Sequence, residues 1–306
     1  MTESARPAAV DAAASPFHAG ERAIHLRLGI QAGVEQLGRR MIRDHLPAQH
    51  RDFYAGLPYL VIGAADQTGQ PWATVLCGDP GFIRAADDHT LAIRAPRSVA
   101  DAPYGPLASG QAVGLLGIDL ASRRRNRANG RVVETGPDQV VIRVRHTFGN
   151  CPQYITPRPL HGRLPPVTRA VRRSRSLTAQ DAALIRSADT FFIASQHVGE
   201  PASGMDVSHR GGDAGFVRVD GDGTLTFPDY AGNQHFNTLG NLSLDPRAGL
   251  LFVDFTHGDL LHLAGTAHII WDGGELAAFP HAERLLCLRV TQVVRLAGGW
   301  VWRTAR

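Results

Sequence analysis

Three polar residues at alternate positions, Asp206, Ser208 and Arg210, form the pattern with the clearest chemical meaning in this sequence. They lie in the stretch MDVSHRG, which is typical of a short β-strand. Because side chains alternate across a strand, these three would share one face, and Val207 and His209 would point to the other. A carboxylate, a hydroxyl and a guanidinium on one face can hydrogen-bond a polar ligand, and the planar guanidinium suits a phosphate. We therefore expect a binding site for an anionic ligand at this strand.

An aspartate and three asparagines follow this strand: Asp229, Asn233, Asn237 and Asn241. The four-residue spacing of the asparagines would place them along one side of a helix, from which their amides can reach the same ligand. The competing interpretation is local, because Asn233 stands beside Gly232 where such a helix would begin and suits a helix cap. For the strand, the competing interpretation is a solvated sheet edge.

Arginines gather in two short clusters, RRRNR at 123–127 and RAVRRSR at 169–175, although the formal net charge of the chain is only +4. Such clusters favour phosphate or another anion as a partner. Arg124, Arg125 and Arg127 follow an apolar run and are candidates for binding a phosphate or an anionic substrate, the alternative being a solvated surface. Neither cluster contains an aromatic residue on which bases could stack, so no nucleic-acid partner is expected.

The three cysteines, Cys77, Cys151 and Cys287, show no CxxC spacing, which argues against a disulfide framework or a structural zinc site. Cys151 lies in FGNCPQYI without an adjacent histidine to act as its base, so we expect a buried structural cysteine. The first sixteen residues lack the apolar run of a signal peptide, and no later segment is apolar enough for a membrane helix. A cytoplasmic protein without a membrane partner is the resulting expectation.

An internal repeat connects the two halves of the chain. The stretch GQAVGLLGIDL at 110–120 matches DPRAGLLFVDF at 245–255, and the matches extend outward in register. Gly114 corresponds to Gly249 and Gly130 to Gly265, both at an offset of 135 (249 − 114 and 265 − 130). The first half carries Trp72, Thr74 and Leu76 where the second has the polar strand face, so its own ligand site is expected to be degenerate.

Short apolar or alternating runs separated by Gly/Asp turns predict antiparallel strands in each half. The expected strands are 57–65, 71–77, 90–94, 113–120 and 129–146, then 190–195, 205–209, 215–220, 224–228, 248–255, 260–270 and 284–303. The expected helices are 18–43, 47–56, 178–188 and 233–243, with a capping box at Thr178 and Asp181. Four segments follow: a disordered tail (1–17), a first domain (18–154), a Pro/Arg-rich linker (155–176) and a second domain (177–306).

The order of elements in residues 206–255, namely a strand, a hairpin, the PD..GN turn, a helix with asparagines and the GLLF strand, resembles the FMN-binding split barrel of the pyridoxamine 5′-phosphate oxidase-like superfamily. The first half resembles it more loosely, through GQPWATVLCGDPGFI (69–83) and AVGLLGIDLASRRRNRANGRV (112–132). The resemblance implies a mainly β protein with a few helices (α+β), built as two tandem split β-barrels. It implies FMN as cofactor, held by these residues: Asp206, Val207, Ser208, Arg210, Asp229, Asn233, Asn237, Asn241, Arg124 and Arg127.

The function implied by the resemblance is that of an FMN-dependent oxidoreductase acting on a small molecule. Its electron donor would be a nicotinamide cofactor or a separate reductase, and a homodimer would be one way to pair the barrels. Three alternatives remain: a deazaflavin-dependent reductase, a haem-binding or haem-degrading split barrel, and a non-catalytic flavin-binding module. The sequence contains no GxGxxG following a strand, P-loop, HExxH or GxSxG motif, which removes several other enzyme classes. No catalytic residue and no metal ligand is assigned.

Overall fold

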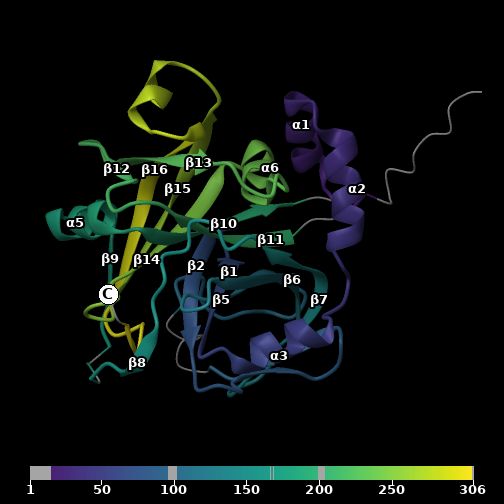
Figure 1. The fold of residues 1–306 in the computed structure, drawn as a ribbon. Coiled ribbons are helices and arrows are strands. Elements are labelled where there is room, and N and C mark those ends of the chain that lie inside the picture. Colours follow the sequence, from purple (N-terminus) through teal and green to yellow (C-terminus); the bar gives the residue numbers. More distant parts are fainter. Residues whose placement is uncertain (1–14, 96–101, 166, 168, 199–203, 305–306) are drawn as a thin grey trace, which may run out of the picture.

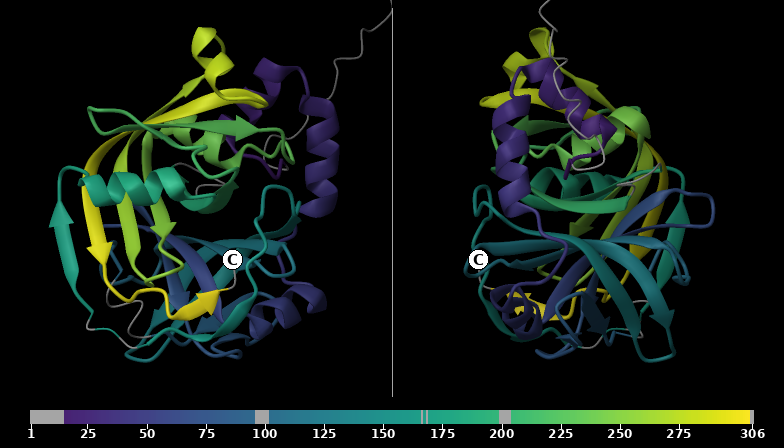
Figure 2. Two further views of the ribbon diagram at one scale, coloured as in Figure 1. Left: turned by 60° about the vertical axis from the view of Figure 1, so that its left-hand side comes forward. Right: turned by 90° about the vertical axis from the view of Figure 1, so that its right-hand side faces the viewer.

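The computed structural model describes residues 15–95, 102–165, 167, 169–198 and 204–304. Two antiparallel sheets make up most of this structure, with the second sheet stacked on the first and helices α1 and α2 running along one side (Figure 1 and Figure 2). The mainly β fold with a few helices is therefore confirmed. Within these ranges no helix is long and apolar enough to cross a membrane.

The first sheet has seven strands in the order β2-β1-β5-β6-β7-β4-β3. Their bounds are β1 Tyr59–Ala65, β2 Pro71–Cys77, β3 Ile83–Ala85, β4 Thr90–Ile93, β5 Ala112–Asp119, β6 Arg124–Thr135 and β7 Val140–Asn150. The single strand expected over 129–146 is in fact β6 and β7, which pair with each other across a turn at 136–139.

The second sheet runs in the order β11-β10-β14-β15-β16-β13-β12, and the short β9 pairs with β16. The bounds are β9 Val171–Ser174, β10 Thr190–His197, β11 Gly204–Gly211, β12 Arg218–Val219, β13 Thr224–Tyr230, β14 Arg247–Val253, β15 Leu260–Ile270 and β16 Ala282–Leu296. A separate pair is formed by β8 (Leu160–Arg163) and β17 (Trp302–Thr304). The segment expected to be a plain linker thus supplies two strands, because exposed strand edges offer it unpaired N–H and C=O groups.

The two sheets have the same strand order when β1 is matched with β10 and each following strand in turn. Their irregularities also match, since β6 shifts register between Asn129 and Gly130 and β15 shifts between Ala264 and Gly265. Such bulges bend a strand and increase its twist. The two halves of the chain therefore share one strand order and one bulge position.

A reciprocal contact joins the two sheets at the repeated glycines. A Cβ placed on Gly114 of β5 would lie 2.8 Å from the backbone N of Val207 on β11. A Cβ placed on Gly249 of β14 would lie 2.3 Å from the carbonyl O of Pro71 on β2. Only glycine permits such a close approach of two backbones. Around this contact an apolar cluster mixes residues of both sheets, among them Leu116 and Leu251.

Helices cover the edges of this two-sheet core. Their bounds are α1 Ala19–Leu28, α2 Gln31–Met41, α3 Ala48–Gly56, α5 Ala179–Ser187, α6 Asn237–Leu244 and the 3₁₀ helix η2 Gly274–Ala278. The capping box at Thr178 is confirmed. The helix expected over 18–43 is divided into α1 and α2 because Gly29 takes a left-handed conformation with φ of 69° and ends the first.

The start of the described chain differs from the expected tail. Most of that tail, residues 1–14, lies outside the described residues, but the Phe17 side chain is only 2% exposed. Its ring packs edge-on against His25 and His235. Helix α1 then crosses α6 so closely that a Cβ on Gly20 would meet the carbonyl O of Gly240 at 2.1 Å. The N-terminal segment is therefore anchored beside the second sheet.

The glycine contact yields a stability prediction. Gly114→Ala and Gly249→Ala should each lower the free energy of unfolding by about 1–3 kcal/mol, the usual cost of overpacking, because neither facing backbone can move aside. Urea unfolding monitored by circular dichroism measures this. Gly136→Ala is the matched control, since a Cβ there would come no closer than 3.8 Å to the Gln139 carbonyl O. Equal stability of all three variants would contradict the backbone contact between the sheets.

Candidate functional site

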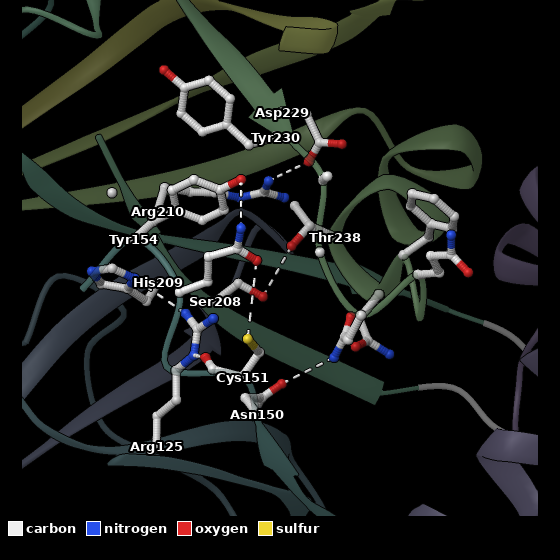
Figure 3. Close-up of a pocket in the computed structure, with 18 of the residues that line it drawn as sticks. Arg125, Asn150, Cys151, Tyr154, Ser208, His209, Arg210, Asp229, Tyr230 and Thr238 are labelled. Atoms are coloured by element: carbon white, nitrogen blue, oxygen red, sulfur yellow. Dashed lines mark hydrogen bonds and ion pairs between the residues drawn. The ribbon is translucent and has the colours of Figure 1, made fainter. Parts of the chain in front are cut away.

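A pocket lies where the edge strand β11 of the second sheet meets the first sheet (Figure 3). From the second half it is lined by Ser208–Gly211 on β11, by the segment 228–234 and by the start of α6. From the first half come residues of β6 and the segment just after β7, which includes Cys151 and Tyr154. Both halves of one chain therefore build a single site.

Arg127 of β6 is the centre of the polar network behind this pocket. Its Nε forms an ion pair with Asp206 Oδ1 at 3.0 Å, and its Nη2 donates to Ser208 Oγ at 2.5 Å and to the Val207 carbonyl O at 3.2 Å. Its Nη1 donates to Asn237 Oδ1 at 2.5 Å. Arg127 is 5% exposed and Asp206 is 2% exposed, so this ion pair is buried. Most donors of Arg127 are thus committed within the protein.

The polar face expected on β11 is present, but two of its members are already bonded. The Ser208 hydroxyl accepts from Arg127 and Thr238 and donates to Asp206 Oδ2 at 3.0 Å. Asp206 also accepts from Asn129 Nδ2 at 3.3 Å. Val207, predicted as a cofactor contact, places its side chain in the apolar cluster between the sheets and offers only its carbonyl, to Arg127. Asp206 and Ser208 therefore hold Arg127 in place and offer few free polar groups to a ligand.

Arg210 and Asp229 form a second ion pair, which Figure 3 shows at the wall of the pocket. The other carboxylate oxygen of Asp229 pairs with Nε of the buried Arg284 at 3.2 Å. One carboxylate is thus shared by two guanidinium groups. Nε of Arg210 is buried and has no hydrogen-bond partner in the structure, so Arg210 keeps a donor for another acceptor.

Arg125, rather than the predicted Arg124, is the second β6 arginine in the pocket. Because side chains alternate along β6, Arg125 and Arg127 face the pocket, whereas Arg124 is exposed on the other face with its guanidinium over the ring of Phe53. Arg125 Nε donates to the Cys151 carbonyl O at 2.8 Å. Burial, together with the positive charges of Arg127 and Arg210, lowers the pKa of Arg125 to about 10. An anion in the pocket would relieve this repulsion.

His209, on the opposite face of β11, also lines the pocket. Its Nδ1 lies 3.2 Å from Arg125 Nη1. Since a guanidinium can only donate, Nδ1 must accept, and the ring proton of the neutral histidine lies on Nε2. Burial and the nearby arginines hold the pKa of His209 well below its usual range. Among the described residues, neither the buried His209 Nε2 nor the Asn150 side-chain nitrogen has a hydrogen-bond partner, so residues that line the pocket carry unpaired donors.

The three asparagines do not share one side of a helix. Helix α6 begins at Asn237, after Phe236 with a left-handed φ of 55°, and Asn233 lies in the preceding loop, where its amide donates to Asn150 Oδ1 at 3.2 Å. Asn233 and Asn237 line the pocket. Asn241 lines a neighbouring pocket instead and donates to Ser195 Oγ at 3.1 Å. The expected spacing was correct, but the helix starts later than predicted.

Cys151 is free and exposed in the pocket, so the expectation of a buried cysteine is wrong. Nearby, the rings of Tyr154 and Tyr230 stack at 5.0 Å. The FGNCPQYI stretch contains Tyr154, but nothing in the sequence pairs it with Tyr230. Among the described residues, no group of three or more His, Cys, Asp or Glu side chains is placed to hold a metal ion.

The equivalent position in the other half is closed. There, Thr74 Oγ1 lies 2.9 Å from His262 Nε2, matching the contact between Ser208 and Arg127 at offsets of 134 (208 − 74) and 135 (262 − 127). Burial lowers the pKa of His262 to about 4, so this histidine is neutral at pH 7. Trp72 and Leu76 are each 1% exposed. An uncharged, filled position thus replaces the charged one, in keeping with the degenerate site expected from the sequence.

Glu21 of α1 lies beside the site and was not predicted from the sequence; in the structure it also forms a capping box with His18. It is 3% exposed, accepts a hydrogen bond from the Asn237 side chain and accepts from the His18 backbone N at 2.9 Å. Burial, with a smaller contribution from the charge of Asp206, raises the pKa of Glu21 to about 8. The carboxyl group is therefore protonated at neutral pH. Through Asn237 it is connected to Arg127.

Comparison with known proteins gives one family match. Residues 177–294 match the model of the pyridoxamine 5′-phosphate oxidase family. No curated protein matches the chain. Among solved structures, HupZ of Group A Streptococcus is 16% identical, with 37% of this chain and 89% of that chain covered and a TM-score of 0.30. The FAD binding protein of Mycobacterium smegmatis is 17% identical, with 42% and 98% covered and a TM-score of 0.27. A FAD-binding protein of Mesorhizobium loti is 14% identical, with 42% and 98% covered and a TM-score of 0.28.

The central ion pair can be tested by mutation. Arg127→Ala should lower the free energy of unfolding by about 3–5 kcal/mol, because it leaves the Asp206 carboxylate buried without its cation. Chemical unfolding measures the change. Arg124→Ala is the control on the same strand, since the Arg124 side chain is exposed, and it should cost less than about 1 kcal/mol. Similar losses for the two variants would show that the buried pair is not formed.

The protonated Glu21 predicts a pH dependence. Its folded-state pKa of about 8 lies above the ordinary value of 4.5, so the unfolded chain releases this proton at lower pH than the folded chain. The contribution of Glu21 to stability is complete below about pH 4.5 and is lost as the pH rises through about 8. Relative to Glu21→Gln, the wild type should therefore lose stability between pH 5 and pH 8. Urea unfolding of both proteins at several pH values tests this, and parallel pH profiles would refute it.

Proposed function

We propose that this chain, whose residues 177–294 match the pyridoxamine 5′-phosphate oxidase family model, binds FMN in the pocket between its two sheets and acts as an oxidoreductase on a small molecule. The observation that carries the proposal is the excess of guanidinium groups at the pocket. Arg125, Arg127 and Arg210 line it, whereas the two nearby carboxylates, Asp206 and Asp229, are engaged in ion pairs. Within the described chain, Arg125 has no carboxylate partner. A phosphate group would supply the missing negative charge.

The unpaired donors of the pocket also suit this ligand. FMN carries a phosphate and a ring system rich in hydrogen-bond acceptors. Arg210 Nε, His209 Nε2 and the Asn150 amide nitrogen are buried donors without partners, and leaving such donors unpaired costs about 1–3 kcal/mol each. A ligand that brings acceptors would recover this cost. The stacked Tyr154 and Tyr230 add a flat aromatic surface at the same pocket, suited to contact with a planar ring.

The roles of the protein groups follow from these contacts. A bound flavin supplies the redox chemistry, and the protein binds, orients and shields it. Arg125 and Arg210 hold the anionic end, and Arg127 is fixed behind them by Asp206, Ser208 and Asn237. Asn150 and His209 donate hydrogen bonds, the latter as a neutral imidazole. No side chain of the pocket is required as an acid or base in this proposal.

One flavin per chain is expected. The equivalent position of the other half is filled by Trp72 and Leu76 and carries the neutral His262 in place of Arg127. Both walls of the open pocket come from one chain, so a homodimer is not needed to complete it. The electron donor that we propose is a soluble nicotinamide cofactor or a separate reductase.

Titration with FMN and with riboflavin tests the proposal. The protein should bind about one FMN per chain, with the absorption bands of oxidised flavin retained after desalting. Arg125→Gln should weaken FMN binding about 10- to 100-fold, the scale of a charged hydrogen bond, and should change riboflavin binding much less because riboflavin lacks the phosphate. Arg124→Gln is the matched control and should bind both like the wild type.

The other outcomes of this titration are equally informative. A protein that binds neither flavin, but takes up haem or a deazaflavin, would keep the split barrel and overturn the proposed cofactor. Equal loss of FMN and riboflavin in Arg125→Gln would place the phosphate elsewhere. Bleaching of bound flavin by a nicotinamide cofactor under anaerobic conditions would identify the donor, and its absence would point to a separate reductase.

A further inference from the structure

A second pocket lies on the other side of the Arg127–Asp206 ion pair. It is formed by the β6–β7 hairpin, the start of β11, helix α6 and the N-terminal segment from Ser15 to Glu21. Asn237 lines both pockets, Arg127 lines the first and Asp206 lines the second, so the bonded side chains of the central network separate the two. The proposed flavin site makes no use of this space.

Two arginines give the second pocket its charge. Arg131 and Arg145 line it, and neither has a carboxylate partner among the described residues. Arg131 Nη1 donates to the Gly110 carbonyl O at 2.9 Å, which positions its guanidinium and leaves its other donors available. Arg145 is exposed, and within the described part of the chain its guanidinium forms no hydrogen bond or ion pair, so it is free to turn toward a ligand.

The acidic groups nearby do not cancel this charge. Asp206 is neutralised by Arg127 at 3.0 Å, and Glu21 holds its proton because burial raises its pKa to about 8. The two histidines of this pocket add no positive charge at neutral pH. Burial lowers the pKa of His18 to about 4 and the pKa of His146 below its usual value. At neutral pH the pocket therefore presents two guanidinium groups among neutral side chains.

The side chain of Asn129 indicates which further group an anionic ligand of this pocket carries. The side-chain carbonyl oxygen of Asn129 is buried without a hydrogen-bond partner, and Asn129 lines this pocket. A carbonyl oxygen needs a donor, such as a hydroxyl group or the O–H of a monoprotonated phosphate. An anion that also carries a donor satisfies both the guanidinium groups and this oxygen.

We propose that this second pocket is an anion-binding site, in which Arg131 and Arg145 bind a phosphate or carboxylate group of a small molecule that also carries a hydrogen-bond donor. Two sources share this chemistry. One is free phosphate, and the other is the phosphate or carboxylate group of a small-molecule substrate. The site itself does not depend on which ligand fills the first pocket.

Binding of inorganic phosphate tests the site. Calorimetric titration at fixed ionic strength and pH 7 should show saturable binding to the wild-type protein. The double variant Arg131→Gln/Arg145→Gln should bind phosphate at least tenfold more weakly, because both guanidinium groups are lost. Arg143→Gln is the matched control: Arg143 is exposed on β7, two residues from Arg145, and does not line the pocket. It should bind within twofold of the wild type. Circular dichroism spectra confirm that each variant is folded.

Repeating the titration with saturating FMN or riboflavin separates the second pocket from the flavin site. Phosphate that competes with FMN but not with riboflavin would bind at the flavin phosphate position beside Arg125 and Arg210 and would overturn the second site. Phosphate that binds the FMN-saturated protein identifies a separate anionic ligand. Absence of saturable phosphate binding in the wild type, or equal weakening in Arg143→Gln, would overturn the proposal. If the protein binds neither FMN nor riboflavin but still binds phosphate, the flavin proposal fails and the second anion site stands.

Discussion

The close contact between the two sheets at Gly114 and Gly249 is the constraint on which the rest of the structure depends. It brings the backbone of β5 against β11 and the backbone of β14 against β2, at distances that no other residue allows. Because the contact is reciprocal, the edge strand β2 of the first sheet lies against the second sheet, and its counterpart β11 lies against the first sheet. The pocket exists because β11, docked in this way, carries its side chains up to β6 of the first sheet.

The same docking makes two equivalent positions, and the sequence gives them opposite character. At one, Arg127 meets Asp206 and Ser208; at the other, the neutral His262 meets Thr74 next to Trp72. A buried arginine needs a carboxylate and further acceptors, so the polar version requires several matched residues at once. The neutral His262 needs only the Thr74 hydroxyl, 2.9 Å from its Nε2, and the Val294 carbonyl O, 3.3 Å from its Nδ1. The scaffold tolerates both, which explains how one position can remain a site while the other is filled.

Much of this arrangement could be predicted from the sequence, for physical reasons that differ between residues. Strand alternation and the repeat offset are local signals, so the polar face of β11 and the degenerate first copy followed from them. The choice between Arg124 and Arg125 depends on where β6 begins, and one residue changes the face completely. The start of α6 depends on the left-handed Phe236, for which the sequence gives no signal. Glu21 reaches the site only because α1 crosses α6 at Gly20 and Gly240, a contact between distant parts of the chain.

The buried pair of Arg127 and Asp206 is better explained by function than by stability. Removing two charges from water costs several kcal/mol per ion, and apolar residues in their place are often as stable or more so. The other half of this chain provides a related comparison, since its equivalent position holds the neutral His262 and Thr74 and no ion pair within the same scaffold. Folding therefore does not demand the charges. What the pair does accomplish is to fix a guanidinium between two cavities, with Arg125 and Arg210 on one side and Arg131 and Arg145 on the other. The expected gain for that cost is a rigid wall between the two pockets that needs no reorganisation when an anion arrives.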